Sequence, residues 1–183
     1  MHLYPAGAAD SADIELLLDA AFEPGRHTRT AYRLRDGVAP YRGLSLVARE
    51  RGRLVGSIQY WPCELWDGAS ARHLTLLGPV AVAPDLQGTG LGKRLMRASL
   101  EVADACRHDA IVLIGDPEYY GRFGFDAAAT ADWDVPGPVE RHRLLARLAP
   151  GVELPARGQL RAVSSVPAWM RLPLPIREAA LAA

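Results

Sequence analysis

An apolar strand that leads into a glycine-rich turn and then into a long helix constrains this chain more than any other feature. The segment is Leu77-Gly-Pro-Val-Ala-Val-Ala-Pro-Asp-Leu-Gln-Gly-Thr-Gly-Leu-Gly-Lys-Arg94. Its alternating glycines free the backbone to close on a ligand, and the helix directs the positive end of its dipole at the same place. The segment therefore predicts a turn that binds a pyrophosphate.

The helix after these glycines is amphipathic, and a buried strand follows it. Between Gly88 and Arg107, apolar residues recur at the spacing of one helical face: Leu91, Leu95, Ala98, Val102 and Cys106. Ala110–Ile114 is short, wholly apolar and rich in branched residues, as expected of a buried strand. Strand, helix and strand in this order predict a parallel strand pair with one crossover.

Two helices are expected near the start of the chain. Asp10 or Ser11 can cap the first, which ends near Pro24. The apolar residues on its buried face are Ile14, Leu17, Leu18 and Ala21. A second, more basic helix is predicted over Arg26–Asp36, where Gly37 ends it.

The remaining segments complete a mixed central sheet. Leu44–Ala48 and Leu54–Trp61 are predicted to pair as an antiparallel hairpin through a tight turn at Glu50-Arg-Gly52. The other expected elements are a strand over His73–Val82, a short helix over Pro117–Gly121, and strands over Leu144–Leu148 and Gln159–Val163. The predicted fold class is α/β: a sheet antiparallel at its start and parallel at a splayed strand pair, with helices on both faces.

Composition limits the classes of function. The 183 residues suit one domain over 1–183, and equal numbers of basic and acidic residues leave no electrostatic footprint for nucleic acid. Cys63 and Cys106 cannot form a disulfide framework and are expected to be small buried hydrophobes in a reduced cytosol. No apolar run approaches about 18 residues and no leader opens the chain, so we expect a cytoplasmic protein without a membrane partner.

Two other phosphate-binding turns fit the glycines poorly. A P-loop needs glycine where Gln87 stands and serine or threonine where Arg94 stands. A dinucleotide fingerprint needs glycine at Lys93 and an acid at the end of the next strand, which instead ends at Ile114. An ordinary tight turn, with no ligand, remains the third alternative.

Two observations favour an anion site over an ordinary turn. Lys93 and Arg94 lie in the first helical turn, where the dipole disfavours each cation by about 0.3–1 kcal/mol, and a bound anion would reverse that sign. Pro79 cannot donate to a sheet ladder, so it belongs at an edge or a bulge. A strand that splays there leaves backbone groups free for a ligand.

The two motifs together resemble a known family. Val80-Ala-Val-Ala-Pro-Asp-Leu-Gln-Gly-Thr-Gly-Leu-Gly92 resembles the acetyl-CoA signature Gln/Arg-x-x-Gly-x-Gly/Ala of the GCN5-related N-acetyltransferase superfamily. Gly115-Asp-Pro-Glu-Tyr-Tyr-Gly-Arg-Phe-Gly-Phe125 resembles its Tyr-x-x-x-Gly-Phe segment, and the doubled tyrosine is similar to a bacterial, YhbS-like subgroup. The resemblance runs from the first helix to Phe125, about two thirds of the chain.

This resemblance implies an N-acetyltransferase that uses acetyl-CoA as cosubstrate and needs no metal. The backbone of the splayed strand would pair with the pantetheine arm, and amides of the glycine turn would hold the pyrophosphate. The implied cofactor-binding residues are Val80, Ala81, Val82, Gln87, Gly88, Thr89, Gly90, Leu91, Gly92 and Lys93. A backbone N–H near Val80 could stabilise the oxyanion.

Tyr120 stands where the family places its general acid, five residues before Phe125. A tyrosine with a usual pKa of about 10 is protonated at neutral pH and suits a leaving thiolate whose usual pKa is about 8.5–9. The alternative for Tyr120 is an aromatic wedge beside Phe123, and Tyr119 is expected to pack.

No general base is assigned, because the strand before the turn carries no carboxylate. Candidates are His73, Glu64, Asp116 and Glu118, although a solvated or structural role is the favoured interpretation for each of them. Asp116 in particular can cap the short helix that begins at Pro117.

The expected acceptor is a primary amine of a small molecule or peptide, bound by a monomer or homodimer. Arg26, Arg29 and Arg33 share one helical face, and Arg35 and Arg42 follow. They could hold an anionic acceptor or the CoA 3′-phosphate, although a solvated basic face is the favoured interpretation. Two other functions stay open: a CoA-binding or sensing module without turnover, and a nucleotide-binding domain.

Overall fold

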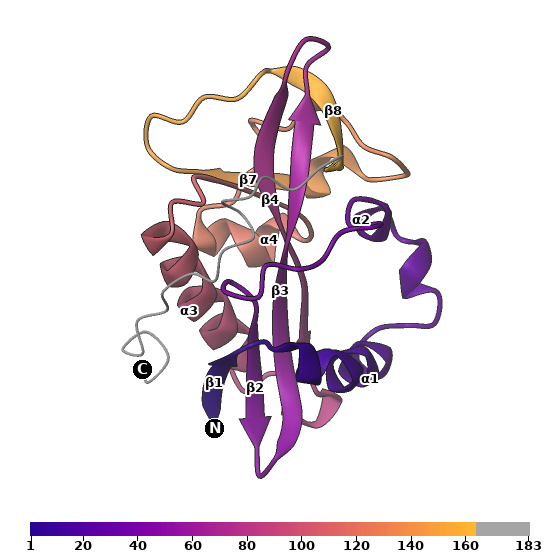
Figure 1. The fold of residues 1–183 in the computed structure, drawn as a ribbon, viewed down its shortest axis with the longest axis vertical. Helices are drawn as coiled ribbons and strands as arrows, with labels where there is room; N and C mark the ends of the chain where they lie inside the picture. The colour runs from indigo at the N-terminus through magenta and orange to yellow at the C-terminus, as the bar shows by residue number, and fades with distance from the viewer. Residues whose placement is uncertain (164–183) are drawn as a thin grey trace.

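A mixed sheet built on two long antiparallel strands organises the structure, a computed structural model that describes residues 1–163 (Figure 1). The long strands are β3 (Arg53–Trp66) and β4 (Ala71–Val82). The sheet order is β1-β2-β3-β4-β5-β7, with β8 also pairing with β3 and β6 pairing with β8. The bounds of the other strands are β1 (His2–Pro5), β2 (Leu46–Glu50), β5 (Ala110–Ile114), β6 (Asp132–Asp134), β7 (Leu144–Leu148) and β8 (Arg157–Ala162).

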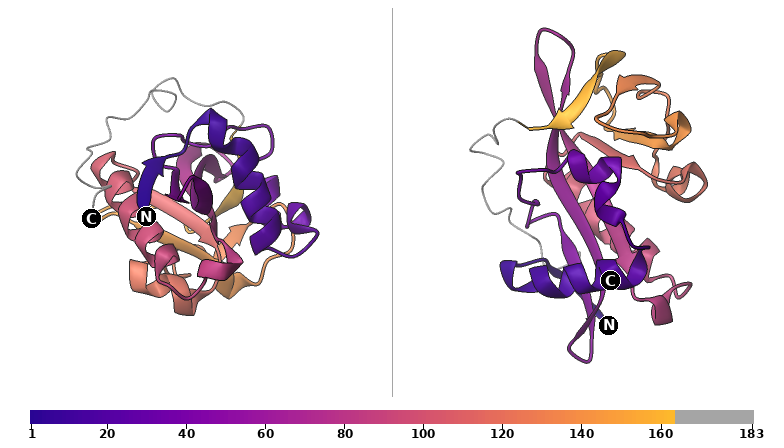
Figure 2. Two further views of the ribbon diagram at one scale, coloured as in Figure 1. Left: turned by 90° about the horizontal axis from the view of Figure 1, so that it is seen from below. Right: turned by 90° about the vertical axis from the view of Figure 1, so that its right-hand side faces the viewer.

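Helices cover both faces of this sheet, as the fold class predicted (Figure 2). The helix α3 (Leu91–Ala105) lies on one face, while α1 (Ser11–Ala21) and α2 (Thr30–Arg33) lie on the other. A further helix, α4 (Pro117–Tyr120), follows β5. The single-turn elements are η1 (Ala8–Asp10), η2 (Arg26–Thr28), η3 (Pro84–Leu86), η4 (Gly121–Phe123) and η5 (Arg141–Arg143).

The predicted strand–helix–strand unit is confirmed. The strands β4 and β5 run parallel and pair only at Thr75–Ile111 and Leu76–Val112, so they diverge beyond Leu76. The helix α3 begins at Leu91 rather than at Gly88, because the preceding glycines adopt positive φ angles that no right-handed helix contains. Its predicted apolar face is buried except at Cys106, which is half-buried and follows the last helical residue.

A bulge in β4 lies where Pro79 predicted an edge or a bulge. The register between β3 and β4 shifts because Gln59 alone faces the two residues Gly78 and Pro79. The peptide bond between those two residues is cis. The hairpin of β2 and β3 is also confirmed, with β3 extending to Trp66, five residues beyond the predicted end.

The second helix departs from the prediction. Instead of one helix over Arg26–Asp36, the chain forms η2 and the four-residue α2, separated by Arg29 in an extended conformation with ψ of 145°. The first helix is confirmed, and its buried residues include Ile14. Asp10 stands at its N-cap position but makes no capping bond, because its carboxylate accepts from the Gly7 amide and from Arg49.

The strands after Asp126 and the short strand β1 were predicted with mixed success. The strand β7 matches its predicted bounds, and β8 begins two residues earlier than predicted. Neither β1 nor β6 is predicted from the sequence, since each is short and is fixed by pairing with a distant strand. Residues 164–183 of the expected single domain lie outside the described part of the chain.

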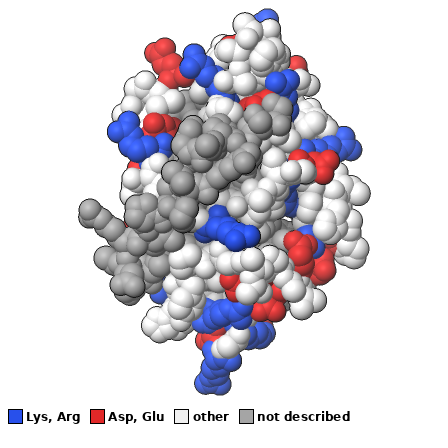
Figure 3. Space-filling view, viewed as in Figure 1, with Lys and Arg blue, Asp and Glu red and all other residues white. Residues whose placement is uncertain are grey.

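Surface charge and helix length add two observations. On the face that Figure 3 presents, Lys and Arg side chains alternate with Asp and Glu side chains rather than forming one basic surface. Within residues 1–163, every helix is too short or too polar to cross a lipid bilayer.

Candidate active site

The glycine turn joins η3 to α3 and exposes a row of backbone donors. Gly88 and Gly90 have φ angles of 81° and 90°, values that L side chains rarely adopt, so glycine is required at both positions. The first helical bond runs from the Arg94 amide to the Gly90 carbonyl, at 3.0 Å. Across the described residues, the amides before it that lack an acceptor belong to Gly88, Gly90, Leu91, Gly92 and Lys93.

These free amides meet the positive end of the α3 dipole, which makes the turn suited to an anion. Lys93 and Arg94 lie in the first turn of α3, as predicted. Gln87 and Thr89 are exposed in the same turn and bond only locally, Gln87 to the Val82 carbonyl and Thr89 to the Leu86 carbonyl.

The splayed strand supplies a second set of free backbone groups next to the turn. Val80, Ala81 and Val82 pair with β3 along one edge. Their other edge has no strand partner, because the β4–β5 pairing ends at Leu76. An extended ligand could therefore lie between the strands and bond to the backbone of β4.

A cleft of about 980 Å³ opens at the inner end of this gap. The β4 bulge, the end of β5 and Tyr120 of α4 line the cleft, together with residues of η2, α2 and the loop from Pro138 to Arg143. Val80 and Tyr120 line it, whereas the residues of the glycine turn do not. The structure therefore places the turn and the cleft as neighbouring sites joined by β4.

Gly115 fixes the position of Tyr120 in this cleft. A Cβ atom on Gly115 would lie only 2.3 Å from Cε2 of the tyrosine ring, so the ring packs directly on the backbone after β5. Burial raises the pKa of Tyr120 to about 12, Tyr119 and Asp116 add to the shift, and Arg143 opposes it. Within residues 1–163, the Tyr120 hydroxyl has no hydrogen-bond partner, so it is free to meet a ligand.

Tyr119 is the residue that packs in the aromatic cluster. Its ring centroid lies 4.9 Å from that of Tyr120 and 5.7 Å from that of Phe123. Its hydroxyl points to Gly92 in the first turn of α3, 3.2 Å from the place of a Cβ atom there. The wedge beside Phe123, considered above for Tyr120, is therefore Tyr119.

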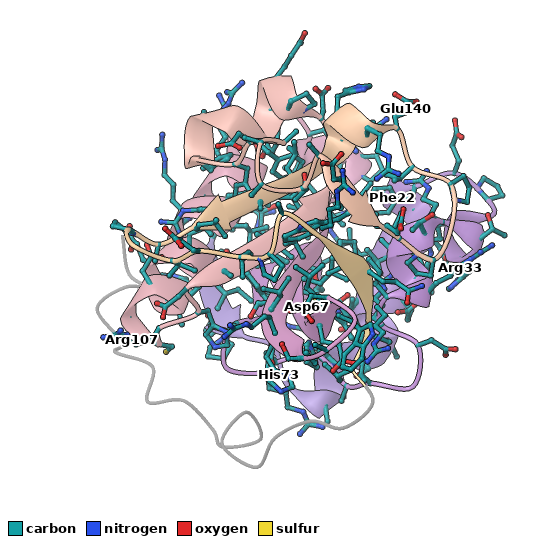
Figure 4. All side chains as sticks on the ribbon, turned by 90° about the horizontal axis from the view of Figure 1, so that it is seen from above. Phe22, Arg33, Asp67, His73, Arg107 and Glu140 are labelled. Carbon is teal, nitrogen blue, oxygen red and sulfur yellow. The ribbon has the colours of Figure 1, made fainter. Side chains whose placement is uncertain are left out.

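The four candidate bases all lie outside the cleft lining. Glu64 is 2% exposed and accepts a hydrogen bond from Arg161 at 2.7 Å. Asp116 caps α4, as predicted, by accepting from the Glu118 amide at 3.0 Å, and Glu118 itself is exposed. His73 is exposed and lies well away from Phe22 and Glu140, two residues of the cleft (Figure 4).

The favoured interpretation of the arginines is wrong for two of them. Arg26 is 4% exposed and binds Glu15 at 2.5 Å and Asp19 at 2.8 Å. Arg35 is 8% exposed and stacks on Tyr32, with its Cζ atom 3.6 Å from the ring centroid. Because the helix breaks at Arg29, the arginines do not share one solvated face.

Arg26, Arg29 and Arg35 all line the cleft, while Arg33 and Arg42 are exposed outside it. Burial lowers the pKa of the Arg35 guanidinium from its usual value. Because Arg26, Arg29 and Arg35 line the cleft and not the glycine turn, their charges act in the cleft.

Sequence reasoning missed the cleft wall that the loop at 136–143 supplies. Thr30 donates to the Pro138 carbonyl at 2.7 Å and Arg33 to the Pro136 carbonyl at 2.8 Å, which fixes this loop on α2. Glu140, the one carboxylate of the cleft lining in the described chain, and Arg143 then face the cavity. No local motif marks them, because their position depends on contacts about 100 residues apart in sequence.

In the part of the chain that the structure describes, no group of three or more His, Cys, Asp or Glu side chains is arranged to hold a metal ion. Cys63 is buried, as predicted, and Cys106 is half-buried; both are free thiols.

The fold and this arrangement define a class: an acyl-CoA-dependent transferase with a splayed parallel strand pair. Comparison with known proteins agrees, since the model of the acetyltransferase (GNAT) family matches residues 12–125. The chain belongs to this family. Membership confirms the enzyme class predicted from the sequence, an acetyl-CoA-dependent N-acetyltransferase.

Individual relatives support the YhbS-like resemblance. The chain is 31% identical over 125 residues to the uncharacterized N-acetyltransferase YhbS of Escherichia coli, covering 67% of this chain and 72% of that one. It is 28% identical over 137 residues to the uncharacterized N-acetyltransferase YjhQ of Escherichia coli K12, covering 74% and 76%.

Solved structures support the same family and the predicted cosubstrate, acetyl-CoA. The crystal structure of Escherichia coli YhbS in complex with CoA matches with a TM-score of 0.69 and 25% identity, covering 88% of each chain. A GNAT acetyltransferase from Brucella melitensis in complex with acetyl-CoA matches with a TM-score of 0.64 and 29% identity, covering 89% of this chain and 96% of that one. These complexes agree with the predicted cosubstrate.

Proposed function

We propose that this protein transfers an acetyl group from acetyl-CoA to a primary amine by direct attack in a ternary complex. The observation that carries the proposal is the pair of neighbouring sites joined by β4: free helix-start amides on one side and a cleft containing Tyr120 on the other. Family membership supplies the reaction class, and the two sites supply places for donor and acceptor.

The donor would bind along the turn and the splayed strand. Amides between Gln87 and Lys93 would hold the pyrophosphate, with the α3 dipole behind them. The free edge of Val80, Ala81 and Val82 would pair with the amides of the pantetheine arm. This path leads the thioester from the turn to the cleft, because Val80 belongs to both.

The proposed reaction uses two residues that line the cleft, Val80 and Tyr120. The amine nitrogen attacks the thioester carbonyl, the new C–N bond forms, and the C–S bond breaks to release the CoA thiolate. A backbone N–H near Val80 would stabilise the oxyanion of the tetrahedral intermediate. Tyr120 would give its proton to the thiolate. The proton that the nitrogen loses would pass to water, and water would return a proton to Tyr120, so the products are the acetamide and CoA thiol.

The Tyr120 hydroxyl suits the role of the acid. Since burial raises its pKa to about 12, it stays protonated throughout the range in which amines are nucleophilic. No protein base is part of the proposal, because the four candidate bases lie outside the cleft and Glu140, the carboxylate in its lining, lies 3.4 Å from His142. We also propose a cytoplasmic location, which fits the two free thiols, and a monomer or homodimer.

An amine panel tests this function. Purified protein with acetyl-CoA is offered primary amines and peptides, and thiol release and acetylated products are measured by absorbance and mass. Acetylation of at least one amine, dependent on the protein, supports an enzyme. CoA binding with no turnover on any amine would instead favour the CoA-binding or sensing module, and preferential binding of NAD or ATP would favour a nucleotide-binding domain.

A further inference from the structure

Arg35 places a buried guanidinium in the lining of the cleft that also contains Tyr120, and it lines a smaller pocket with Glu15 and Asp36 as well. Its Cζ atom lies 3.6 Å from the centroid of the Tyr32 ring and 5.0 Å from that of the Trp61 ring. These aromatic contacts hold the guanidinium plane, and the Tyr32 side chain also forms a hydrogen bond with it. The N–H groups that Tyr32 does not use can donate to a ligand. Arg35 is therefore pre-positioned before any ligand arrives.

No carboxylate of the described residues forms an ion pair with Arg35. Glu15 and Asp19 both bind Arg26, and Glu15 acts on Arg35 only at longer range. The side chains of Glu15 and Asp19 are 55% and 64% exposed, so water screens their charge. A desolvated charge without a close partner is costly, and a bound anion would remove that cost.

The other charges of the cleft add to this positive potential. Arg29 and Arg143 line the cleft, and neither forms an ion pair within residues 1–163. Glu140 is the opposing carboxylate of the lining, and it lies 3.4 Å from His142. The lining thus carries an excess of cations on the side of the acceptor.

We propose that the acceptor is a small primary amine that carries a carboxylate, and that Arg35 binds this carboxylate. The inference rests on the proposed acetyl transfer and names its substrate class. A planar guanidinium edge matches the two oxygens of a carboxylate, and the negative charge of Glu140 in the same lining opposes the second charge of a dianionic phosphate. With the carboxylate at Arg35, the amine would extend along the cleft toward Val80 and Tyr120.

Calorimetric titration of CoA-saturated protein with matched probes tests this. The probes are β-alanine, γ-aminobutyrate and ε-aminocaproate, the amide of each, and aminopropylphosphonate. At least one acid is expected to bind about 10-fold more tightly than its amide, which corresponds to about 1.4 kcal/mol. Equal affinities of acids and amides would overturn the proposal, and tighter binding of the phosphonate would overturn the choice of carboxylate.

Variants locate the interaction. Arg35→Met keeps the length of an apolar stem but removes the charge, so the preference for the acid should vanish. Arg35→Lys keeps the charge without the planar fork, so a partial preference should remain. Arg42→Met removes an exposed arginine outside the cleft and should bind like the wild type. A full preference in Arg35→Met would contradict the assignment; if that variant does not fold, Arg35→Lys decides.

The same titrations separate failure of this inference from failure of the proposed function. CoA binding is measured first, and it does not depend on Arg35. A protein that binds CoA and acetylates amines, but shows no preference for carboxylates, retains the proposed function and loses the inference. A protein that binds neither CoA nor acetyl-CoA loses both.

Discussion

Replacing Tyr120 by phenylalanine removes the proposed acid and little else. The ring packs on Gly115, and its centroid lies 6.2 Å from that of Phe125, so phenylalanine can keep the same position. The Tyr120 hydroxyl bonds to no residue in the described chain, so its loss breaks no hydrogen bond. We expect the free energy of unfolding to change by no more than about 0.5 kcal/mol.

The effect on turnover is much larger. A positioned general acid contributes about 10²–10⁴-fold to the rate, which corresponds to about 2.7–5.5 kcal/mol of barrier. Because the acid acts on the leaving thiolate, kcat should fall while the KM for acetyl-CoA stays unchanged. Since the pKa of Tyr120 is about 12, the wild-type kcat should not decline near the usual tyrosine pKa of 10.

The assay is thiol release from acetyl-CoA with a saturating amine, followed over a range of pH. Tyr119→Phe is the matched control, because the Tyr119 hydroxyl points to Gly92 and away from the cleft. Its kcat should match that of the wild type. A folded Tyr120→Phe variant with kcat within about 3-fold of the wild type would refute the role of Tyr120 as the acid.

Two further predictions concern the glycine turn and a half-buried histidine. Gly90→Ala should weaken CoA binding and lower the free energy of unfolding, because a φ of 90° costs an L residue about 1–2 kcal/mol. Gly121→Ala is the control: Gly121 has a φ of −55° and open space around it, so neither quantity should change. Calorimetry with CoA and thermal unfolding measure the two effects. A CoA affinity of Gly90→Ala equal to that of the wild type would contradict the role of the turn in CoA binding. Burial lowers the pKa of His108 below 6.5 in the folded protein, so the unfolded chain binds the proton more readily. The free energy of unfolding should therefore decrease as the pH is lowered from about 7 to about 5. Urea unfolding should show a smaller pH dependence in His108→Gln; an unchanged dependence would contradict this.

The local structure of the glycine turn, of the helix start after it and of the β4 bulge was largely predictable from the sequence. Its features are local: the glycines need positive φ angles, the helix start follows them directly, and Pro79 forces the neighbouring bulge. Tyr120 is likewise placed by a local feature, the short helix α4 that directly follows β5. Such features depend on residues a few positions apart, so spacing and residue type were sufficient to locate them.

The cleft wall formed by Arg35 and the loop that contains Glu140 was not predictable in the same way. The second helix breaks at Arg29, and Arg35 is buried by stacking on Tyr32 and Trp61, the latter on a strand 26 residues later in the sequence. Glu140 reaches the cleft because Thr30 and Arg33 fix its loop. Helical periodicity alone therefore predicted that the arginines of this segment form a solvated basic face. The tertiary contacts show instead that Arg35 is buried.

A crystal structure of this protein with CoA tests most directly whether the free amides at the start of α3 bind the diphosphate. The prediction is that diphosphate oxygens lie within about 3.2 Å of backbone nitrogens between Gly88 and Lys93, with the pantetheine arm beside Val80. A diphosphate bound elsewhere, with these amides still free of it, would contradict the account.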